Sequence, residues 1–256
     1  MVTDTEGIVL RQVKTLNGRR MLLLFSKKFG KISVGTNLTE GGKNKSALSV
    51  RPFTYGRYEL FKSRDVYSLN SGQVIRSYYG LGEDLDKYMA ASYAMELTEK
   101  ILEDELAQPR IFTTLLEFFN ALDKRSGKYD TLVLAYIVKL LDITGTMPML
   151  DTCAVCGSHE VNRFFSVDEG GMLCGNCAQN LETERNNEPL IYDTNFGIVN
   201  ILKFFKKESF TSFEKIALND EISKKLQTIL KKYMAYHLDI GRLKCEDFLI
   251  KETGGI

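Results

Sequence analysis

Four of the five cysteines in this chain of 256 residues lie in one short stretch, and their spacing constrains the fold more than any other feature. They form two C-x-x-C pairs, Cys153 with Cys156 and Cys174 with Cys177, separated by 17 residues. Each pair can turn two thiolates toward a point about 2.3 Å away, and two such pairs complete the tetrahedron of a four-cysteine zinc site. The spacing predicts a zinc ribbon over residues 151–180.

A disulfide or inert buried thiols are the alternatives to a metal. The chain starts with MVTDTEGIVL, which carries acidic residues where an export signal would be basic and then apolar. No apolar run is long enough to span a membrane. These features predict a cytoplasmic location, where the reducing environment disfavours disulfides and favours metal binding.

The predicted zinc site is structural rather than catalytic. Four thiolates fill the coordination sphere and leave no position for a water molecule. A zinc deaminase requires H-x-E and P-C-x-x-C, whereas His159 and Glu160 are adjacent and no proline precedes Cys174. His159 as a replacement ligand is the alternative to its being a solvated loop residue. Structural Zn²⁺ would contribute on the order of 10 kcal/mol to local folding.

The net charge of +1 hides an asymmetry along the chain. Residues 1–80 carry 14 Lys and Arg against 5 Asp and Glu, a net charge of +9, and the remaining residues carry 20 against 28, a net charge of −8. Such a division predicts at least two modules with different partners. We expect the basic third to bind a polyanion and the acidic remainder not to.

The first 80 residues have the pattern of a small β-barrel. Short β-branched or aromatic runs separated by turn residues predict strands at Gly7–Val13, Met21–Ser26, Lys31–Gly35, Phe53–Phe61 and Val66–Ile75. Asn17-Gly18 predicts a hairpin turn after the first of them. Five short strands are typical of an OB-fold or an SH3-like barrel.

From residue 81 the hydrophobic period becomes helical. Helices are predicted at Asp84–Leu106, Ile111–Leu122, Tyr129–Thr144, Phe196–Lys206, Ser212–Ala217 and Asp220–His237. Gly145 is a stop signal, Asn219 an N-cap, and the triplet Glu103-Asp104-Glu105 a charged helix end. The chain is therefore expected to be α+β, with a barrel at 1–80, a helical domain in two parts at 81–150 and 181–256, and the ribbon between them.

Basic residues cluster where the loops of the barrel would lie. On an OB-fold, the face of strands 2 and 3 and the loops after strands 1 and 4 form the usual nucleic-acid groove. The candidate phosphate contacts are Arg11, Lys14, Arg19, Arg20, Lys27, Lys28, Lys31, Lys43, Lys45, Arg51, Arg57, Lys62 and Arg64. Such binding is electrostatic and tolerant of sequence, with a strong salt dependence.

Aromatic side chains between these cations are candidates for stacking on bases. The candidates are Tyr55, Tyr58 and Phe61. Alternation places Tyr55, Arg57 and Phe61 on one face and Tyr58 with Leu60 on the other. The pattern leaves open which face is exposed.

No motif for bond chemistry is found: there is no P-loop, GxGxxG or G-x-S-x-G, and there are only two histidines. The sequence predicts a binding protein rather than an enzyme. The alternatives are an RNA-binding protein with an OB-fold and a zinc ribbon, a zinc-dependent hydrolase or deaminase, and an interaction scaffold.

Several stretches resemble the RecO family of bacterial recombination-repair mediators. They are EGIVLR at 6–11, LFSKKFGKIS at 24–33, RPFTYGRYELFK at 51–62, CAVCG at 153–157, GGMLCGNCA at 170–178, and YMAYHL and LKCEDFL near the end. The resemblance covers essentially the whole chain in the same order. It implies an OB-fold, a helical domain with an inserted zinc ribbon, and a nucleoid-associated protein. It also implies binding to single- and double-stranded DNA, strand annealing, and action with RecR to load RecA onto DNA coated by single-stranded DNA-binding protein.

Overall fold

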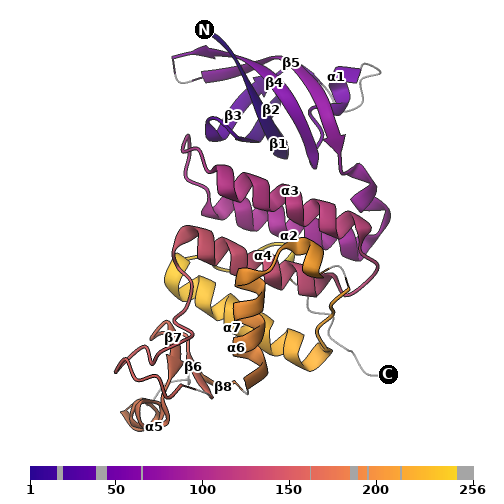
Figure 1. Cartoon of the computed structure of the whole chain (residues 1–256). Helices are drawn as coiled ribbons and strands as arrows, with labels where there is room; N and C mark the ends of the chain where they lie inside the picture. The colour runs from indigo at the N-terminus through magenta and orange to yellow at the C-terminus, as the bar shows by residue number, and fades with distance from the viewer. Residues whose placement is uncertain are drawn as a thin grey trace. The chain divides into compact units, whose positions relative to one another are not determined.

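The computed structural model (Figure 1) describes residues 1–15, 20–38, 45–64, 66–161, 163–184, 190–194, 196–213 and 215–246. The chain forms two compact units, residues 1–125 and residues 126–256. Within the described residues, no helix combines the length and hydrophobicity that crossing a bilayer requires.

The first unit begins with a closed five-stranded barrel. Its strands are β1 (Val2–Lys14), β2 (Arg20–Ser26), β3 (Gly30–Thr36), β4 (Thr54–Ser63) and β5 (Val66–Ser77). They pair in the order β1-β2-β3-β5-β4, and β4 closes the barrel against β1. All pairs are antiparallel except β3 with β5, which meet only at Val34–Tyr67 and Gly35–Ser68. The predicted five-stranded OB-fold is confirmed, whereas the predicted Asn17-Gly18 turn lies outside the described residues.

Alternating hydrophobic side chains close this barrel. Leu22 and Leu24 of β2 point inward and are buried, whereas Leu23 between them is half-buried. Tyr58 and Leu60 of β4 are fully buried in the same core. The face that alternation assigned to Tyr58 and Leu60 is therefore the inner face.

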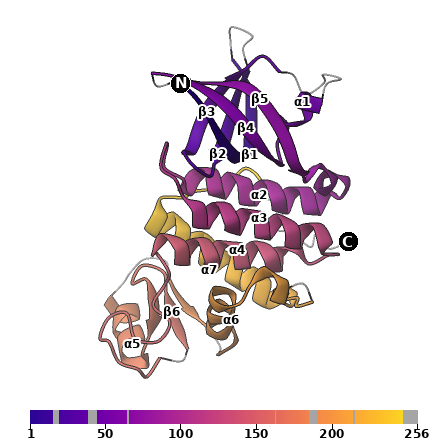
Figure 2. The ribbon, with the colours of Figure 1, turned by 45° about the horizontal axis from the view of Figure 1, so that its top comes forward.

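Two helices of the same unit cover one end of the barrel (Figures 1 and 2). After a short helix, α1 (Lys45–Leu48), between β3 and β4, the chain leaves the barrel through the 3-10 helix η1 (Tyr79–Glu83). It then forms α2 (Leu85–Ile101) and α3 (Pro109–Lys124). Phe112 of α3 packs edge-on to Phe25 of β2, with ring centroids 5.3 Å apart, so that α3 fixes its apolar face on the barrel wall.

The predicted helix Asp84–Leu106 is too long. Asp84 caps its start by accepting a hydrogen bond of 3.0 Å from the backbone N–H of Lys87, but α2 ends at Ile101. The interpretation of Glu103-Asp104-Glu105 as a charged helix end is therefore wrong. These residues follow the helix in an irregular segment, in which Asp104 forms a parallel bridge with Lys31 of β3 and Glu105 adopts φ +57°. A contact with the barrel, distant in sequence, replaces the helical continuation.

The second unit is built on helix α4 (Tyr129–Thr144), which is buried along most of its length because it is apolar on all sides. Helices α6 (Phe196–Lys207) and α7 (Asp220–Leu238) and the 3-10 helix η2 (Phe210–Phe213) pack against it. The predicted stop signal of α4 and the predicted N-cap of α7 are confirmed. Gly145 ends α4 with φ +75°, and the Asn219 side chain at the start of α7 accepts a hydrogen bond of 2.8 Å from Ile222 N–H.

The helix predicted at Ser212–Ala217 is wrong. The chain instead makes the single 3-10 turn of η2, and residues 215–219 are turn or irregular. Phe213 packs edge-on against Phe205 of α6, with centroids 5.2 Å apart, and Phe210 packs edge-on against Phe213. Aromatic packing on α6 therefore decides the local conformation.

A small sheet interrupts the helices of the second unit. Its strands β6 (Phe164–Ser166), β7 (Gly171–Leu173) and β8 (Ile191–Asp193) are antiparallel in the order β7-β6-β8, and helix α5 (Gly175–Glu184) follows β7. Strand β8 comes from the part of the chain that the sequence assigned to the second helical region. The sheet of the ribbon therefore extends beyond residue 180.

Candidate metal centre and nucleic-acid interface

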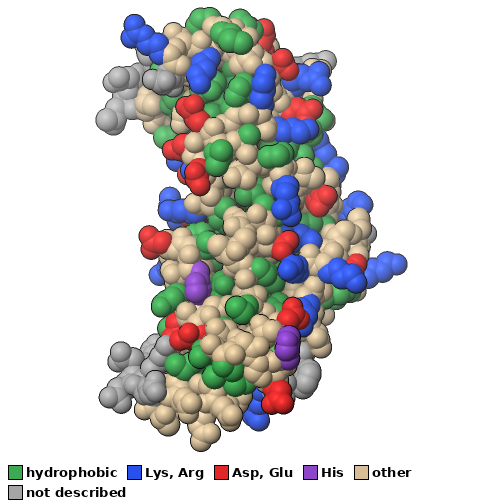
Figure 3. Space-filling model, turned by 60° about the vertical axis from the view of Figure 1, so that its left-hand side comes forward, with side chains coloured by type: hydrophobic (Ala, Val, Ile, Leu, Met, Phe, Trp, Pro, Cys, Tyr) green, Lys and Arg blue, Asp and Glu red, His purple; other side chains and the backbone are tan. Residues whose placement is uncertain are grey.

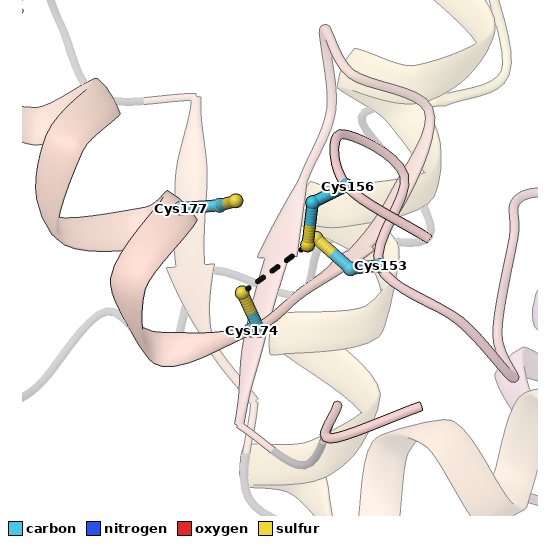
Figure 4. A group of neighbouring side chains, drawn as sticks. All are labelled: Cys153, Cys156, Cys174 and Cys177. Carbon is cyan, nitrogen blue, oxygen red and sulfur yellow. Dashed lines mark hydrogen bonds between the residues drawn. The ribbon is translucent and has the colours of Figure 1, made fainter. Parts of the chain in front are cut away.

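The four cysteines of the two C-x-x-C pairs meet at one point (Figure 4). Their Sγ atoms all lie within 4.8 Å of one another, and those of Cys156 and Cys174 are 3.7 Å apart. Four sulfurs placed 2.3 Å from a central zinc ion are about 3.8 Å from each other. The arrangement can therefore hold a metal ion in tetrahedral geometry, as the spacing predicted.

Local backbone structure turns the two pairs toward each other. The N–H of Gly157 donates to the Cys153 carbonyl at 2.9 Å, and Gly157 adopts φ +74°, which favours glycine. Cys174 and Cys177 lie at the start of α5, where the helix dipole favours thiolates. His159 is exposed and does not belong to the cysteine group.

The thiols perturb one another strongly. Burial raises the pKa of Cys153, but hydrogen bonds from the backbone of Cys156, Cys174 and Val155 outweigh it and lower that pKa to about 6. The pKa of Cys177 is raised to about 12, first by its hydrogen bond with Cys174 and then by burial. Four thiolates at this spacing repel one another, so a divalent cation is the group that this donor set accommodates.

The ribbon around the cysteines has a small core of its own and is attached to α7. Cys153, Leu173 and Ala178 form the buried centre of that core. On the neighbouring helix, the Tyr233 ring packs against Phe165, with centroids 6.1 Å apart, and His237 Nε2 lies 2.6 Å from the Val167 carbonyl oxygen. The segment that carries the cysteine group is therefore held both by its own core and by α7.

The structure separates the thirteen predicted phosphate contacts into distinct groups. Arg19 and Lys43 lie outside the described residues, and the side chain of Lys45 is likewise not described. Four others form salt bridges inside the first unit: Arg11 with Glu99, Lys27 with Glu6, Lys31 with Asp104, and Lys62 with Glu105. Arg51 lies over the Tyr79 ring, 5.4 Å from its centroid.

The five remaining predicted contacts form no salt bridge with a described carboxylate; they are Lys14, Arg20, Lys28, Arg57 and Arg64. Lys14 and Arg20 are register partners on β1 and β2. Arg20 donates to Gln12 Oε1 at 3.2 Å, and Lys28 donates to Thr3 Oγ1 at 3.4 Å. Lys14, Arg20, Lys28 and Arg64 therefore remain available to an external anion.

The position of Arg57 differs from that of the other four. Its register partner on β1 is Glu6, and it lines a shallow hollow of about 280 Å³ together with Asp4 and Glu59. Carboxylates therefore surround Arg57 on the β1–β4–β5 face, which makes this face a poor surface for phosphates.

The acidic residues that follow the barrel in the first unit offset much of its positive charge. Residues 81–125 carry 5 Lys and Arg against 10 Asp and Glu, a net charge of −5, so the first unit as a whole carries +9 − 5 = +4. On the face shown in Figure 3, Lys and Arg side chains are interspersed with Asp and Glu side chains. On this face the cations are therefore scattered among carboxylates and form no continuous groove.

The three candidate stacking residues differ in exposure. Tyr58 is fully buried and donates to the Ser49 carbonyl at 2.8 Å, so its predicted stacking role is wrong. Tyr55 packs edge-on against Phe112 and donates to Glu6 Oε2 at 2.9 Å; burial and then this bond raise its pKa to about 12. Phe61 is 47% exposed. Of the three, only Phe61 offers an open ring face.

Tyr79 is an exposed aromatic residue that the sequence pattern did not single out. It is 64% exposed in η1, with Arg51 over its ring. It lies between β5 and α2, where the sequence shows neither the two-residue period of a strand nor the 3.6-residue period of a helix. In the sequence Tyr79 stands three positions after Arg76, and its contact with Arg51, 28 positions away, is visible only in the fold.

Comparison with known proteins agrees with this architecture. The family model described as "Recombination protein O N terminal" matches residues 1–78, and the one described as "Recombination protein O C terminal" matches residues 82–246. The DNA repair protein RecO of Alkaliphilus metalliredigens is 30% identical over 243 residues, covering 93% of this chain and 95% of that protein. The DNA repair protein RecO of a Thermoanaerobacter species is 29% identical and covers 96% of each chain. The chain therefore belongs to the RecO family of DNA repair proteins.

Proposed function

We propose that this protein is a non-enzymatic recombination mediator that binds single- and double-stranded DNA through the cations of its barrel. Membership of a DNA repair family and the closed OB-fold barrel support this proposal. Its main support is the group of barrel cations without a salt bridge, above all the register partners Lys14 and Arg20. A protein that contacts phosphates rather than base edges binds all sequences alike.

The same contacts suit strand annealing. Cations that neutralise phosphates reduce the repulsion between two strands and leave the base edges available for pairing. We further propose that the protein acts with RecR to load RecA onto DNA coated by single-stranded DNA-binding protein. Family membership supports these partners and a cytoplasmic, nucleoid-associated location.

The metal that we propose for the cysteine group is Zn²⁺ in a structural role. When bound, it would hold Cys153, Cys156, Cys174 and Cys177 and cross-link the two ends of the ribbon. Four sulfur ligands match the preference of zinc and leave no position for a substrate. The ribbon then keeps its shape against α7.

The proposal is tested by fluorescence anisotropy of the full chain with a labelled single-stranded DNA oligomer over a range of salt concentrations. We expect a steep salt dependence in the wild type. In Lys14→Gln/Arg20→Gln, the slope of log K against log salt should become shallower by about 1.4, because two phosphate contacts on a single strand are lost.

The control is Lys100→Gln/Lys124→Gln, which removes the same charge from α2 and α3 and should leave the slope unchanged. If both double variants changed the slope equally, the result would reflect the net charge of the protein and not phosphate contacts at Lys14 and Arg20. An RNA oligomer of the same sequence that binds as tightly as DNA would favour the alternative of an RNA-binding protein.

A further inference from the structure

The irregular segment after α2, residues 102–106, contacts an edge of the barrel at β3. The N–H of Glu105 donates to the Lys31 carbonyl at 3.0 Å, and Asp104 pairs with Lys31 in a parallel bridge. Strand β5 pairs with β3 only at Val34 and Gly35, so the segment occupies the other end of the same edge. One parallel bridge and one backbone hydrogen bond thus seat the segment beside β3.

Gly30 permits this close approach. It has φ +71°, and a Cβ atom at this position would lie 2.1 Å from the Leu106 carbonyl oxygen. No side chain fits at that distance. The backbone of the segment is therefore seated on the barrel independently of its charged side chains.

The acidic side chains of this region contact three cations of the barrel. Lys31 Nζ lies 3.2 Å from Asp104 Oδ1, and Lys62 Nζ lies 3.5 Å from Glu105 Oε2. Arg11 Nε lies 3.1 Å from both carboxylate oxygens of Glu99, the α2 residue whose carbonyl also accepts a hydrogen bond from Lys31 Nζ.

Arg11, Lys31 and Lys62, hereafter the cationic row, are linked by these contacts into one connected group. The carboxylates that link them, on Glu99, Asp104 and Glu105, are hereafter the acidic strap. All three cations are among the phosphate contacts expected from the sequence, and each is held by a carboxylate of the same unit.

These ion pairs are of a kind that a polyanion can replace. The side chains of Asp104 and Glu105 are 82% and 51% exposed, and an exposed pair changes an equilibrium by at most about fivefold. The strap carboxylates of Asp104 and Glu105 nevertheless stay beside the cationic row, because the backbone of Glu105 and Leu106 contacts β3 at Lys31 and Gly30. The strap thus acts as a tethered anion at high local concentration.

We propose that the acidic strap is a built-in competitor of nucleic acid for the cationic row, with its carboxylates in the places that phosphates would take. The inference rests on the proposed nucleic-acid binding of the barrel. A strand must displace the carboxylates before it can use these three cations. The strap thereby weakens non-specific binding and reserves the row for a strand that already occupies the other cations.

The test is the variant Asp104→Asn/Glu105→Gln of the full chain, which removes two charges without changing side-chain size. We expect single-stranded DNA to bind roughly threefold to tenfold more tightly at low salt, with a log K slope steeper by up to about 1.4. The matched control is Glu83→Gln/Glu117→Gln, which changes the net charge equally at two exposed positions outside the strap. Unchanged affinity and slope in the strap variant, or an equal gain in the control, would overturn the proposal.

A double-mutant cycle assigns the gain to the row. Lys31→Gln/Lys62→Gln should have little effect in the wild type, where both lysines are already paired, and should abolish the gain in the strap variant. A large loss in the wild-type background would show that the row is already open to DNA. Thermal unfolding of each variant verifies that it is folded.

The two proposals fail in different ways. If neither the wild type nor the strap variant binds DNA, nucleic-acid binding itself is refuted. If the wild type binds through Lys14 and Arg20 while the strap variant binds no better, only the competitor is refuted.

Discussion

The Sγ atoms of Cys156 and Cys174 lie 3.7 Å from each other although 18 positions separate the two residues in the chain. This distance is far longer than the roughly 2.05 Å of a disulfide and matches two ligands of one zinc ion. The five cysteines form no disulfide with one another. The ribbon is therefore arranged for a metal and not for a covalent bridge.

Replacement of Cys174 by serine should remove the metal and loosen the ribbon. Loss of one of four ligands leaves an incomplete tetrahedron, and the free energy of metal binding no longer stabilises the fold around it. We expect the zinc content, measured by atomic absorption, to fall from about one per chain to near zero. DNA affinity should stay within twofold, because the barrel belongs to the other unit.

Cys245→Ser is the matched control, since Cys245 is not part of the cysteine group. It should retain the metal. Zinc that remains bound in the Cys174 variant, or DNA binding that disappears together with zinc, would contradict a purely structural metal.

The hydrogen bond between Tyr55 and Glu6 should make barrel stability depend on pH. This bond and then the bond from Lys27 hold the pKa of Glu6 below its ordinary value of 4.5. Because the folded pKa is the lower one, the stabilisation is fully present above about pH 4.5 and is lost as the pH falls through the folded pKa. We expect Tyr55→Phe to lower the free energy of unfolding by about 1 kcal/mol at pH 7.

The difference between Tyr55→Phe and the wild type should shrink when urea unfolding is repeated between pH 5 and pH 3. Glu6→Gln provides the control, because it removes the titrating group and should flatten the dependence in both backgrounds. A difference that stays constant over this range would show that the bond does not act on Glu6.

Tyr58 and Phe61 should respond in opposite ways, because they lie on opposite faces of β4. Tyr58→Phe removes the buried hydrogen bond to the Ser49 carbonyl, so we expect a loss of about 1–3 kcal/mol in unfolding free energy and unchanged DNA affinity. Phe61→Ala should keep the stability and weaken single-stranded DNA binding by about 1–3 kcal/mol if a base stacks on the ring. Denaturant titrations and anisotropy of both variants test the assignment, which fails if Phe61→Ala binds normally.

Local signals predicted most elements of this fold. Helix caps are short-range chemistry, so Asn219 and Gly145 marked the ends of α7 and α4 correctly. Period-2 alternation separated Tyr58 from Phe61, and the C-x-x-C spacing predicted the cysteine group. The inner face of β4 was left open, because only the closing of the barrel by other strands decides it.

The state of each predicted phosphate contact could not be read from the sequence. Arg11 and Glu99 are 88 positions apart, and their pairing depends on where α2 lies against the barrel. The acidic triplet continued a helical pattern, and only its fit against Gly30 and Lys31 explains why it leaves that pattern. Counting charges along the chain therefore located the basic module but not the cations left over for a ligand.

Tyr233 should control how firmly the ribbon is attached to helix α7 within the second unit. Its hydroxyl donates to the Thr146 carbonyl at 3.0 Å, and its ring contacts the rings of Phe165 of β6 and of His237. Tyr233→Phe removes only the hydrogen bond and should lower the free energy of unfolding by about 1 kcal/mol, whereas Tyr233→Ala also removes the ring and should lower it by about 3–5 kcal/mol.

In the Tyr233→Ala variant we expect limited proteolysis to cut the chain faster within residues 147–194 while zinc stays bound, because the four ligands lie in the ribbon itself. Tyr236→Ala is the control on the same helix, since its side chain is exposed. Equal proteolysis of Tyr233→Ala and the wild type would show that the metal alone holds the ribbon in place.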